Sequence, residues 1–220
     1  MNTKRKAIIW AGAAVLAASL LASSGPQAET ANCIVAVVND QIITLIDVKL
    51  VEAFGFFETG PAASAPERRR FILDKLIDQK VIIELARIKT KIDRAKVDEE
   101  LNGLLARIGG EEVKRRLEQF GLEAADLKPY LSEKILAEAI IADRFGRSVI
   151  VSLREIEAYY AQTYVPEQKK LGREPKPFID VVDILEAEIK KIKAENQVAL
   201  WIKNLREQAE IERRLDCLKN

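Results

Sequence analysis

The feature that most constrains the fold is a long amphipathic stretch near the carboxyl end of the chain. Its apolar residues recur at steps of three and four, with one seven-residue gap around Asn196, and they are Phe178, Val182, Leu185, Ile189, Ile192, Ala199, Ile202 and Leu205. This spacing predicts a single helix of about 30 residues. Because one helix cannot bury such a stripe alone, it must dock on earlier helices or on a second molecule.

The amino-terminal part of the chain shows the pattern of a β-hairpin. Two short runs of β-branched residues, 34–38 and 41–45, flank the pair Asn39-Asp40. This pair is able to adopt the positive φ angles that a tight hairpin needs. Near the other end, we expect residues 210–215 to add a short strand beside this hairpin.

Capping-box spacings predict where three helices begin. The pairs are Thr44 with Asp47, Ser64 with Glu67, and Ser152 with Glu155. In each pair the first side chain caps a backbone N–H and the second reaches back to the cap. The helix that follows Ser64 runs to about residue 89 and has the widest apolar arc, so we expect it to lie at the centre of the domain.

Between this helix and Ser152 the chain is divided into further helices by glycine and proline. Asp93 is placed to cap one helix, Gly109-Gly110 ends it, and Gly121 ends a shorter one. A longer helix is expected over residues 124–145, where Pro129 is tolerable only in the first turn.

These elements predict a mainly α fold with a short amino-terminal β-hairpin and a long carboxy-terminal helix that docks back on it. Residues 29–163 form the helical domain. Residues 164–177 contain three prolines and many charges, which indicates an exposed connector. Residues 178–220 complete the same domain.

The first residues indicate export. Lys4, Arg5 and Lys6 precede an apolar run over residues 7–22, and small residues follow it. This is typical of a secretory signal peptide over residues 1–28. Cleavage is expected near Ala28, with Ser24 as the second choice, and an uncleaved amino-terminal anchor is the alternative. The expected location is the periplasm.

The charge balance gives no sign of nucleic-acid binding. Signal cleavage takes away three of the 35 basic residues and none of the 34 acidic ones, so the mature chain is slightly acidic. Proteins that bind nucleic acid carry a basic stripe or a high pI instead. After cleavage we also expect no membrane span.

The chain contains no histidine, which excludes imidazole bases, histidine ligands and histidine triads. The two cysteines are too few for a four-thiolate zinc site and do not form a C-x-x-C pair. Gly109-Gly110 lacks the spaced glycines and the lysine of a phosphate loop. We therefore expect no catalytic residues, no metal and no cofactor.

Cys33 and Cys217 lie at the start of the mature chain and just past the long final helix. In an oxidising compartment a disulfide between them would tie the two ends together. The alternative is two free or intermolecular thiols.

Six aromatic residues are candidates for lining an apolar groove that holds an extended peptide, since aromatic side chains are efficient anchors at such surfaces. They are Phe54, Phe56, Phe57, Tyr159, Tyr160 and Trp201. The alternative is that they are ordinary core residues, which is the commoner role of aromatics at helical spacing.

The order of these elements resembles the chaperone domain of SurA-type proteins. VAVVNDQIITLIDV at 35–48 is similar to the hairpin and first helix of that domain, and LDKLIDQKVI at 73–82 resembles its central helix. FGL at 120–122 and YLSEKI at 130–135 resemble its next two elements. The similarity covers most of residues 34–163.

The carboxy-terminal part extends this resemblance. Residues 181–215, which include WIKNLR at 201–206, resemble the helix and closing strand with which these proteins return to their amino-terminal part. Family members usually carry one or two parvulin-type prolyl isomerase domains before this helix. Here the connector of residues 164–177 takes that place, so the resemblance implies a core without an isomerase domain.

The resemblance implies a periplasmic chaperone that binds unfolded or partly folded polypeptides, typically outer-membrane proteins in transit, without catalysis or cofactor. Two other functions stay open. One is a structural or assembly subunit whose long helix pairs with a specific partner or with itself as a homodimer. The other is a prolyl isomerase, which only the family's usual activity suggests.

Overall fold

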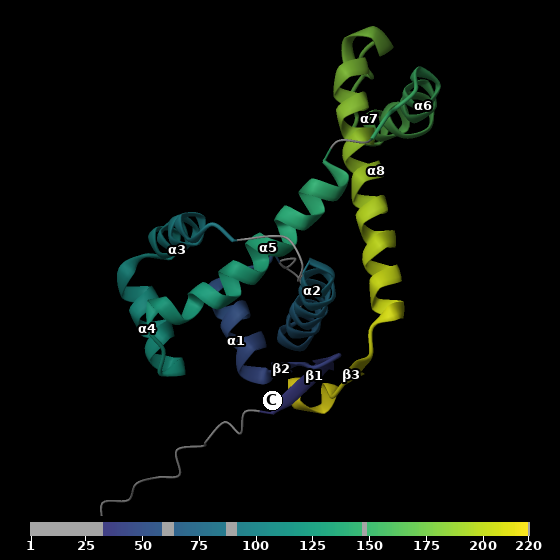
Figure 1. Cartoon of the computed structure of the whole chain (residues 1–220). Helices are drawn as coiled ribbons and strands as arrows, with labels where there is room; N and C mark the ends of the chain where they lie inside the picture. The colour runs from purple at the N-terminus through teal and green to yellow at the C-terminus, as the bar shows by residue number, and fades with distance from the viewer. Residues whose placement is uncertain (1–32, 59–63, 87–91, 147–148, 220) are drawn as a thin grey trace, which may run out of the picture. The chain divides into compact units, whose positions relative to one another are not determined.

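A computed structural model describes residues 33–58, 64–86, 92–146 and 149–219 of the chain (Figure 1). The predicted signal peptide lies outside these residues. The described elements are mainly helical, with a small antiparallel sheet and a long carboxy-terminal helix that contacts earlier elements. This confirms the predicted fold class.

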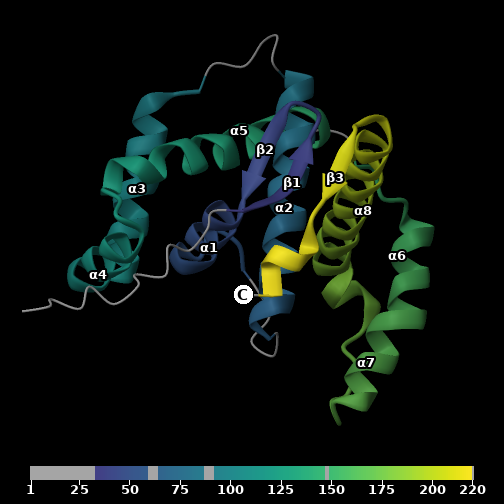
Figure 2. The ribbon, with the colours of Figure 1, turned by 90° about the horizontal axis from the view of Figure 1, so that it is seen from below.

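The sheet joins the two ends of the described chain. Strand β1 (Ile34–Val38) lies between β2 (Gln41–Thr44) and β3 (Ile211–Arg213), and both pairings are antiparallel (Figure 2). Asn39 turns the hairpin with a φ of 51°. It also holds the returning strand, because its backbone N–H donates to the carbonyl of Glu210 over 2.8 Å. Both the hairpin and the closing strand were predicted, and both are confirmed.

Helix α1 (Leu45–Phe54) begins at a complete capping box. The backbone N–H and the hydroxyl of Thr44 each donate to Asp47 over 2.7 Å. Helix α2 (Ala65–Ala86) begins in a related way, with the Ser64 hydroxyl donating to Glu67 over 2.7 Å. Helix α2 contacts the sheet and three helices, α1, α5 and α8, and so takes the predicted central place.

The next helices start and stop where glycine, proline and a cap predict. Asp93 caps α3 (Arg94–Ile108), and Gly109 separates that helix from α4 (Gly110–Phe120). Gly121 ends α4 in the left-handed conformation, with a φ of 63°. A 3₁₀ turn (Ala124–Leu127) leads into α5 (Lys128–Phe145), whose first turn contains the proline.

The carboxy-terminal part begins with α6 (Leu153–Tyr159), capped by Ser152 and Glu155. A π-helical turn (Tyr160–Tyr164) joins it to α7 (Val165–Lys170). Helix α8 (Phe178–Gln208) is the predicted long helix, and a 3₁₀ turn (Leu215–Lys219) follows β3.

The predicted connector over residues 164–177 is helical in its first half. Pro166 lies in the first turn of α7, and the helical run that begins with α6 passes through the π-helical turn into it without a break. The chain leaves the helix only after Lys170, where Gly172 adopts a φ of 67°. The exposed, irregular segment is therefore residues 171–177.

Two groups of buried apolar side chains hold the described elements. The larger group lies between the sheet, α1, α2, α3, α4 and α5, and it includes Ile43, Phe54, Ile77 and Leu131. The smaller group joins α6 to the first half of α8 through Ile156, Val181, Leu185 and Ile189. Helix α8 thus buries its first half against α6 and leaves its second half beside α2 and α5.

Candidate functional site

A cleft of about 750 Å³ is lined by residues of α2, of α5 and of the second half of α8. Figure 1 shows where these three helices lie. Helix α2 contributes Lys75 and Asp78. The lining from α5 and its carboxyl end is Ile141, Ala142, Phe145 and Gly146. The lining from α8 is Ala194, Glu195, Val198, Ala199, Ile202, Lys203 and Arg206.

The walls are apolar because each helix turns one stripe of its sequence toward the cleft. On α8, Ala194, Val198 and Ile202 follow one another at steps of four, which places them on the same side of the helix. On α5, Ile141 and Phe145 have the same spacing. The two stripes therefore form opposite walls along parts of both helices.

A smaller pocket of about 120 Å³ continues the cleft along α2. It shares Lys75, Asp78, Ile141 and Ile202 with the cleft. Phe57 and Ile82 extend its apolar lining away from α8, whereas Lys134 and Glu138 add a salt bridge of 2.7 Å. The open space beside α2 is therefore longer than the main cleft alone.

An ionic network fixes the carboxyl end of α8 to α2 at one end of the cleft. The Arg206 guanidinium donates from Nε to Asp78 over 2.6 Å and from Nη2 to the carbonyl of Asp74 over 2.8 Å. Arg213 of β3 reaches the Asp74 carboxylate at 2.9 Å. Burial raises the pKa of Asp78, and the hydrogen bond from Arg206 opposes that rise without cancelling it.

Two aromatic rings and an arginine hold α5 to α8 on another side of the cleft. The rings of Phe145 and Trp201 meet edge to face, with centroids 5.4 Å apart. The guanidinium of Arg144 lies 5.1 Å from the Trp201 ring and 5.8 Å from the Phe145 ring. Such cation–π contacts favour this arrangement and help set the distance between the two walls.

Two further polar contacts position α5. The Tyr130 hydroxyl donates to Asp47 of α1 over 2.6 Å. Burial first, and then this hydrogen bond, raise the pKa of Tyr130, so it stays a donor at neutral pH. Lys80 of α2 contacts Glu133 at 2.6 Å. Helix α5, which forms one wall of the cleft, is thus held by contacts with both α1 and α2.

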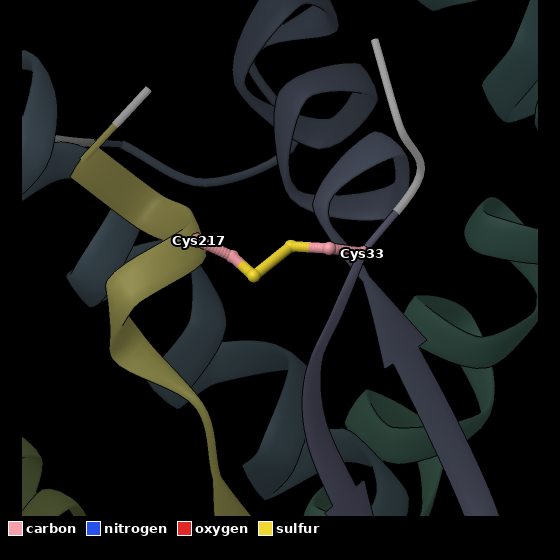
Figure 3. Close-up of a disulfide and its surroundings, with 2 residues drawn as sticks. All are labelled: Cys33 and Cys217. Atoms are coloured by element: carbon pink, nitrogen blue, oxygen red, sulfur yellow. A yellow bond between two sulfur atoms is a disulfide. The ribbon is translucent and has the colours of Figure 1, made fainter.

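A disulfide joins Cys33, just before β1, to Cys217 in the last 3₁₀ turn (Figure 3). The two Cα atoms are 6.4 Å apart, and the cysteines are separated by 184 positions in the sequence. The bridge lies beside the pairing of β1 with β3 and secures the segment that follows α8.

The six aromatic candidates do not come together in one groove. Phe54 and Phe56 are 2% and 8% exposed and belong to the larger core, although Phe56 also lines a separate pocket together with Leu104 and Leu131. Phe57 lines the small pocket. Tyr159 and Tyr160 pack on the smaller core, and Trp201 contacts Phe145 at the edge of the cleft.

The apolar side chains that do form the cleft are mostly aliphatic. Ile202 and Ala199 belong to the apolar pattern that predicts α8, and Ile141 belongs to the pattern of α5. Their periodicity shows which residues share a side of each helix. It does not show which part of each stripe another helix covers, so the cleft could not be located from the sequence.

Comparison with protein families and with curated proteins gives no match. The resemblance to SurA-type proteins therefore stays a prediction.

Every described helix is too short or too polar to cross a membrane. Within the same described ranges, no three or more acidic or cysteine side chains gather in a way that would hold a metal ion.

Proposed function

We propose that this protein is a periplasmic chaperone that holds extended segments of unfolded polypeptides in the cleft between α2, α5 and α8. The observation that carries the proposal is an open cleft of about 750 Å³ with apolar walls on two facing helices. Ligand sites commonly have volumes of roughly 300–1,000 Å³ and mostly apolar linings. Its size therefore suits a peptide segment.

The walls suit an extended chain because side chains of a strand alternate between two sides. A segment lying along the cleft would turn one set of side chains toward Ile141 and Phe145 and the other toward Val198 and Ile202. Contact with aliphatic groups is non-directional, so it discriminates weakly among clients. A holding chaperone needs such weak discrimination among clients. When binding is also weak, a client is released without nucleotide hydrolysis.

The charges around the cleft do not select a client by its net charge. Glu195 and Asp78 are acidic, whereas Lys75, Lys203 and Arg206 are basic. Opposite charges interspersed in this way impose no strong preference for the net charge of a client.

The location and client class come from the sequence. The predicted signal peptide and the disulfide both fit an oxidising compartment outside the cytoplasm. The resemblance to SurA-type proteins adds outer-membrane proteins in transit as the clients. The sequence contains no histidine, and the resemblance implies a core without an isomerase domain. Both support a binding protein without isomerase activity, and a prolyl-peptide isomerisation assay should give no rate above background.

The test is suppression of aggregation by an unfolded outer-membrane protein, followed by light scattering. We expect the mature protein to suppress scattering at near-stoichiometric ratios, and Val198→Asp to lose most of that effect because it places a charge in the apolar wall. Leu200→Asp is the matched control, since Leu200 is 60% exposed on the same helix and does not line the cleft. Unchanged scattering across a concentration series of the parent protein would refute the proposal.

A structural or assembly subunit is the second candidate function. It is favoured by large apolar side chains of α8 that are exposed outside the cleft, such as Ile179 and Leu200. This function predicts a tight dimer or a stable complex with one partner. Sedimentation velocity measures the oligomeric state and so separates the two candidate functions. A tight dimer that no longer binds clients would favour the structural or assembly subunit.

A further inference from the structure

A third pocket, of about 440 Å³, lies between α3, α5 and the segment that follows α1. We call it the α3 pocket. Phe56, Leu104 and Leu131 are buried and form its apolar floor. The charged residues around this floor are Glu58, Glu100, Arg107 and Lys134.

The α3 pocket, the smaller pocket of about 120 Å³ and the cleft follow one another along α5. Lys134 lines both the α3 pocket and the smaller pocket, and Ile141 lines both the smaller pocket and the cleft. The consecutive residues Phe56 and Phe57 line the α3 pocket and the smaller pocket. Each pocket thus shares part of its lining, or an adjoining residue, with the next.

A single side of α5 provides lining to all three pockets. Its residues follow one another at steps of three and four, which places them on the same side of the helix. They are Leu131, Lys134, Glu138, Ile141 and Phe145. Helix α5 contacts both α3 and α8, and Figure 1 shows it running from one to the other.

We propose that the three pockets form one track along α5 that binds a single extended, uncharged polypeptide segment. This inference rests on the proposed chaperone function and extends its site beyond the cleft. Leu131 and Phe145 lie about 21 Å apart along the helix axis. A strand advances about 3.3 Å per residue, so about six or seven residues of a client cover this distance.

The dimensions of the track favour an extended chain over a compact ligand. The middle pocket has a volume of only about 120 Å³, so a compact ligand cannot fill the larger pockets on both sides of it at once. Side chains on one face of a strand recur about every 7 Å, and three such steps cover the same 21 Å. One apolar side chain can therefore enter each pocket while the backbone continues past Lys134.

The charges at the α3 pocket suit an uncharged segment. Glu58 and Glu100 are acidic, whereas Arg107 and Lys134 are basic. Lys134 already lies 2.7 Å from Glu138. Because the two signs balance, a client with a strong net charge gains no advantage there. Contact with the apolar floor provides the binding energy instead.

The first experiment measures binding of two fluorescein-labelled peptides by anisotropy. Both alternate leucine and serine and have blocked ends, and they contain five and nine residues. Five residues of strand span about 16 Å and nine span about 30 Å, so only the longer peptide reaches all three pockets. We expect it to bind the parent protein about fivefold tighter or more, because it buries further apolar side chains.

Phe57→Asp places a charge in the middle of the track but outside the cleft lining. It should remove the advantage of the nine-residue peptide and leave binding of the five-residue peptide in the cleft unchanged. Phe71→Asp is the matched control, since Phe71 is 38% exposed and lines none of the three pockets. It should change neither affinity. Melting curves check that both variants fold.

A second measurement locates the peptide without altering the apolar lining. The photoreactive residue p-benzoylphenylalanine, placed at Arg107, should form an adduct with the nine-residue peptide on irradiation. The same residue at Asn102 is the control. Asn102 is exposed on α3, and five positions place it about 140° from Arg107 around the helix axis. It should give no adduct. This result decides the question if Phe57→Asp does not fold.

The outcomes separate this inference from the proposed function. Equal affinity of the two peptides for the parent protein would overturn the track and leave the cleft standing. An advantage that survives Phe57→Asp, an equal loss in Phe71→Asp, or adducts that do not favour Arg107 over Asn102 would overturn it as well. If neither peptide binds, the cleft itself is not a peptide site, and the track is refuted with it.

Discussion

Arg206 is the side chain that connects α8 most directly to α2. Its guanidinium reaches Asp78 at 2.6 Å, the Asp74 carbonyl at 2.8 Å and the Asp74 carboxylate at 3.4 Å. An arginine can make several hydrogen bonds at once because its donors are arranged in a fixed plane. Asp78 is largely buried, with 16% of its side chain exposed, so it depends on this partner.

Removing Arg206 should therefore destabilise the protein measurably. We expect Arg206→Ala to lower the free energy of unfolding by about 1–3 kcal/mol, because it leaves a buried carboxylate without its hydrogen bond. Urea unfolding followed by circular dichroism measures this. Lys203→Ala is the control, since Lys203 is exposed and lies 3.9 Å from Glu207. It should change the free energy by less than about 0.5 kcal/mol, and equal losses would contradict the role assigned to Arg206.

At the scale of elements, the junction of α6 with α8 depends on a charge. Lys193 of α8 donates to Glu155 over 2.8 Å and to the carbonyl of Ile150 over 2.9 Å. The hydrogen bond from Lys193, together with those from Ser152, lowers the pKa of Glu155 to about 2. The folded protein thus favours ionised Glu155 more than the unfolded chain does.

This difference predicts an acid-dependent contribution to stability. Because the folded pKa is depressed, the contribution is complete above the unfolded value near 4.5 and is lost as the pH falls toward 2. Glu155→Gln keeps the cap, since glutamine also serves in capping boxes, but removes the charge. We expect the parent protein to be more stable than the variant at pH 7 and the difference to shrink between pH 5 and pH 2. A difference that stays constant over this range in urea titrations would contradict the assignment.

Element boundaries set by neighbouring residues were predictable from the sequence. The caps at Thr44 and Ser152 and the left-handed end at Gly121 depend only on residues within a few positions. The prolines of residues 164–177 were misleading, because Pro166 fits the first turn of α7 as well as it fits a connector.

The cleft was beyond prediction for a different reason. Whether an aromatic residue lies in the core or in a groove depends on what packs over it, and Phe54 is covered while Trp201 remains at an edge. The sequence predicts the side of a helix on which a residue lies. It does not predict where α5 ends beside α8.

On the scale of the whole molecule, several contacts hold the segment that follows α8 to earlier parts of the described chain. Strand β3 pairs with β1, Arg213 contacts Asp74, and Cys33 is bonded to Cys217. The sheet, the salt bridge and the disulfide all act on the segment that follows α8. They therefore hold one wall of the cleft through its carboxyl end.

The disulfide should contribute to global stability. A Cys33→Ser, Cys217→Ser variant should lose about 2–4 kcal/mol in urea unfolding without reductant, since a long loop is no longer closed in the unfolded chain. Mass measurement of the unreduced parent protein after thiol alkylation should show no modified cysteine. Two alkylated cysteines in that sample would exclude the bridge. Equal stability of parent and variant would show that the bridge, though formed, adds nothing.

The position of β1 between β2 and β3 also bears on the order in which the sheet can form. Strands β1 and β2 are neighbours in the sequence, whereas β3 follows β2 only after the helices from α1 to α8. Until β3 pairs with β1, the sheet lacks its third strand, and the segment that follows α8 is not held against the hairpin. Contacts between distant parts of a chain form late and slowly. The pairing of β3 with β1 is therefore expected to be a late step of folding, completed after the hairpin of β1 and β2 has formed.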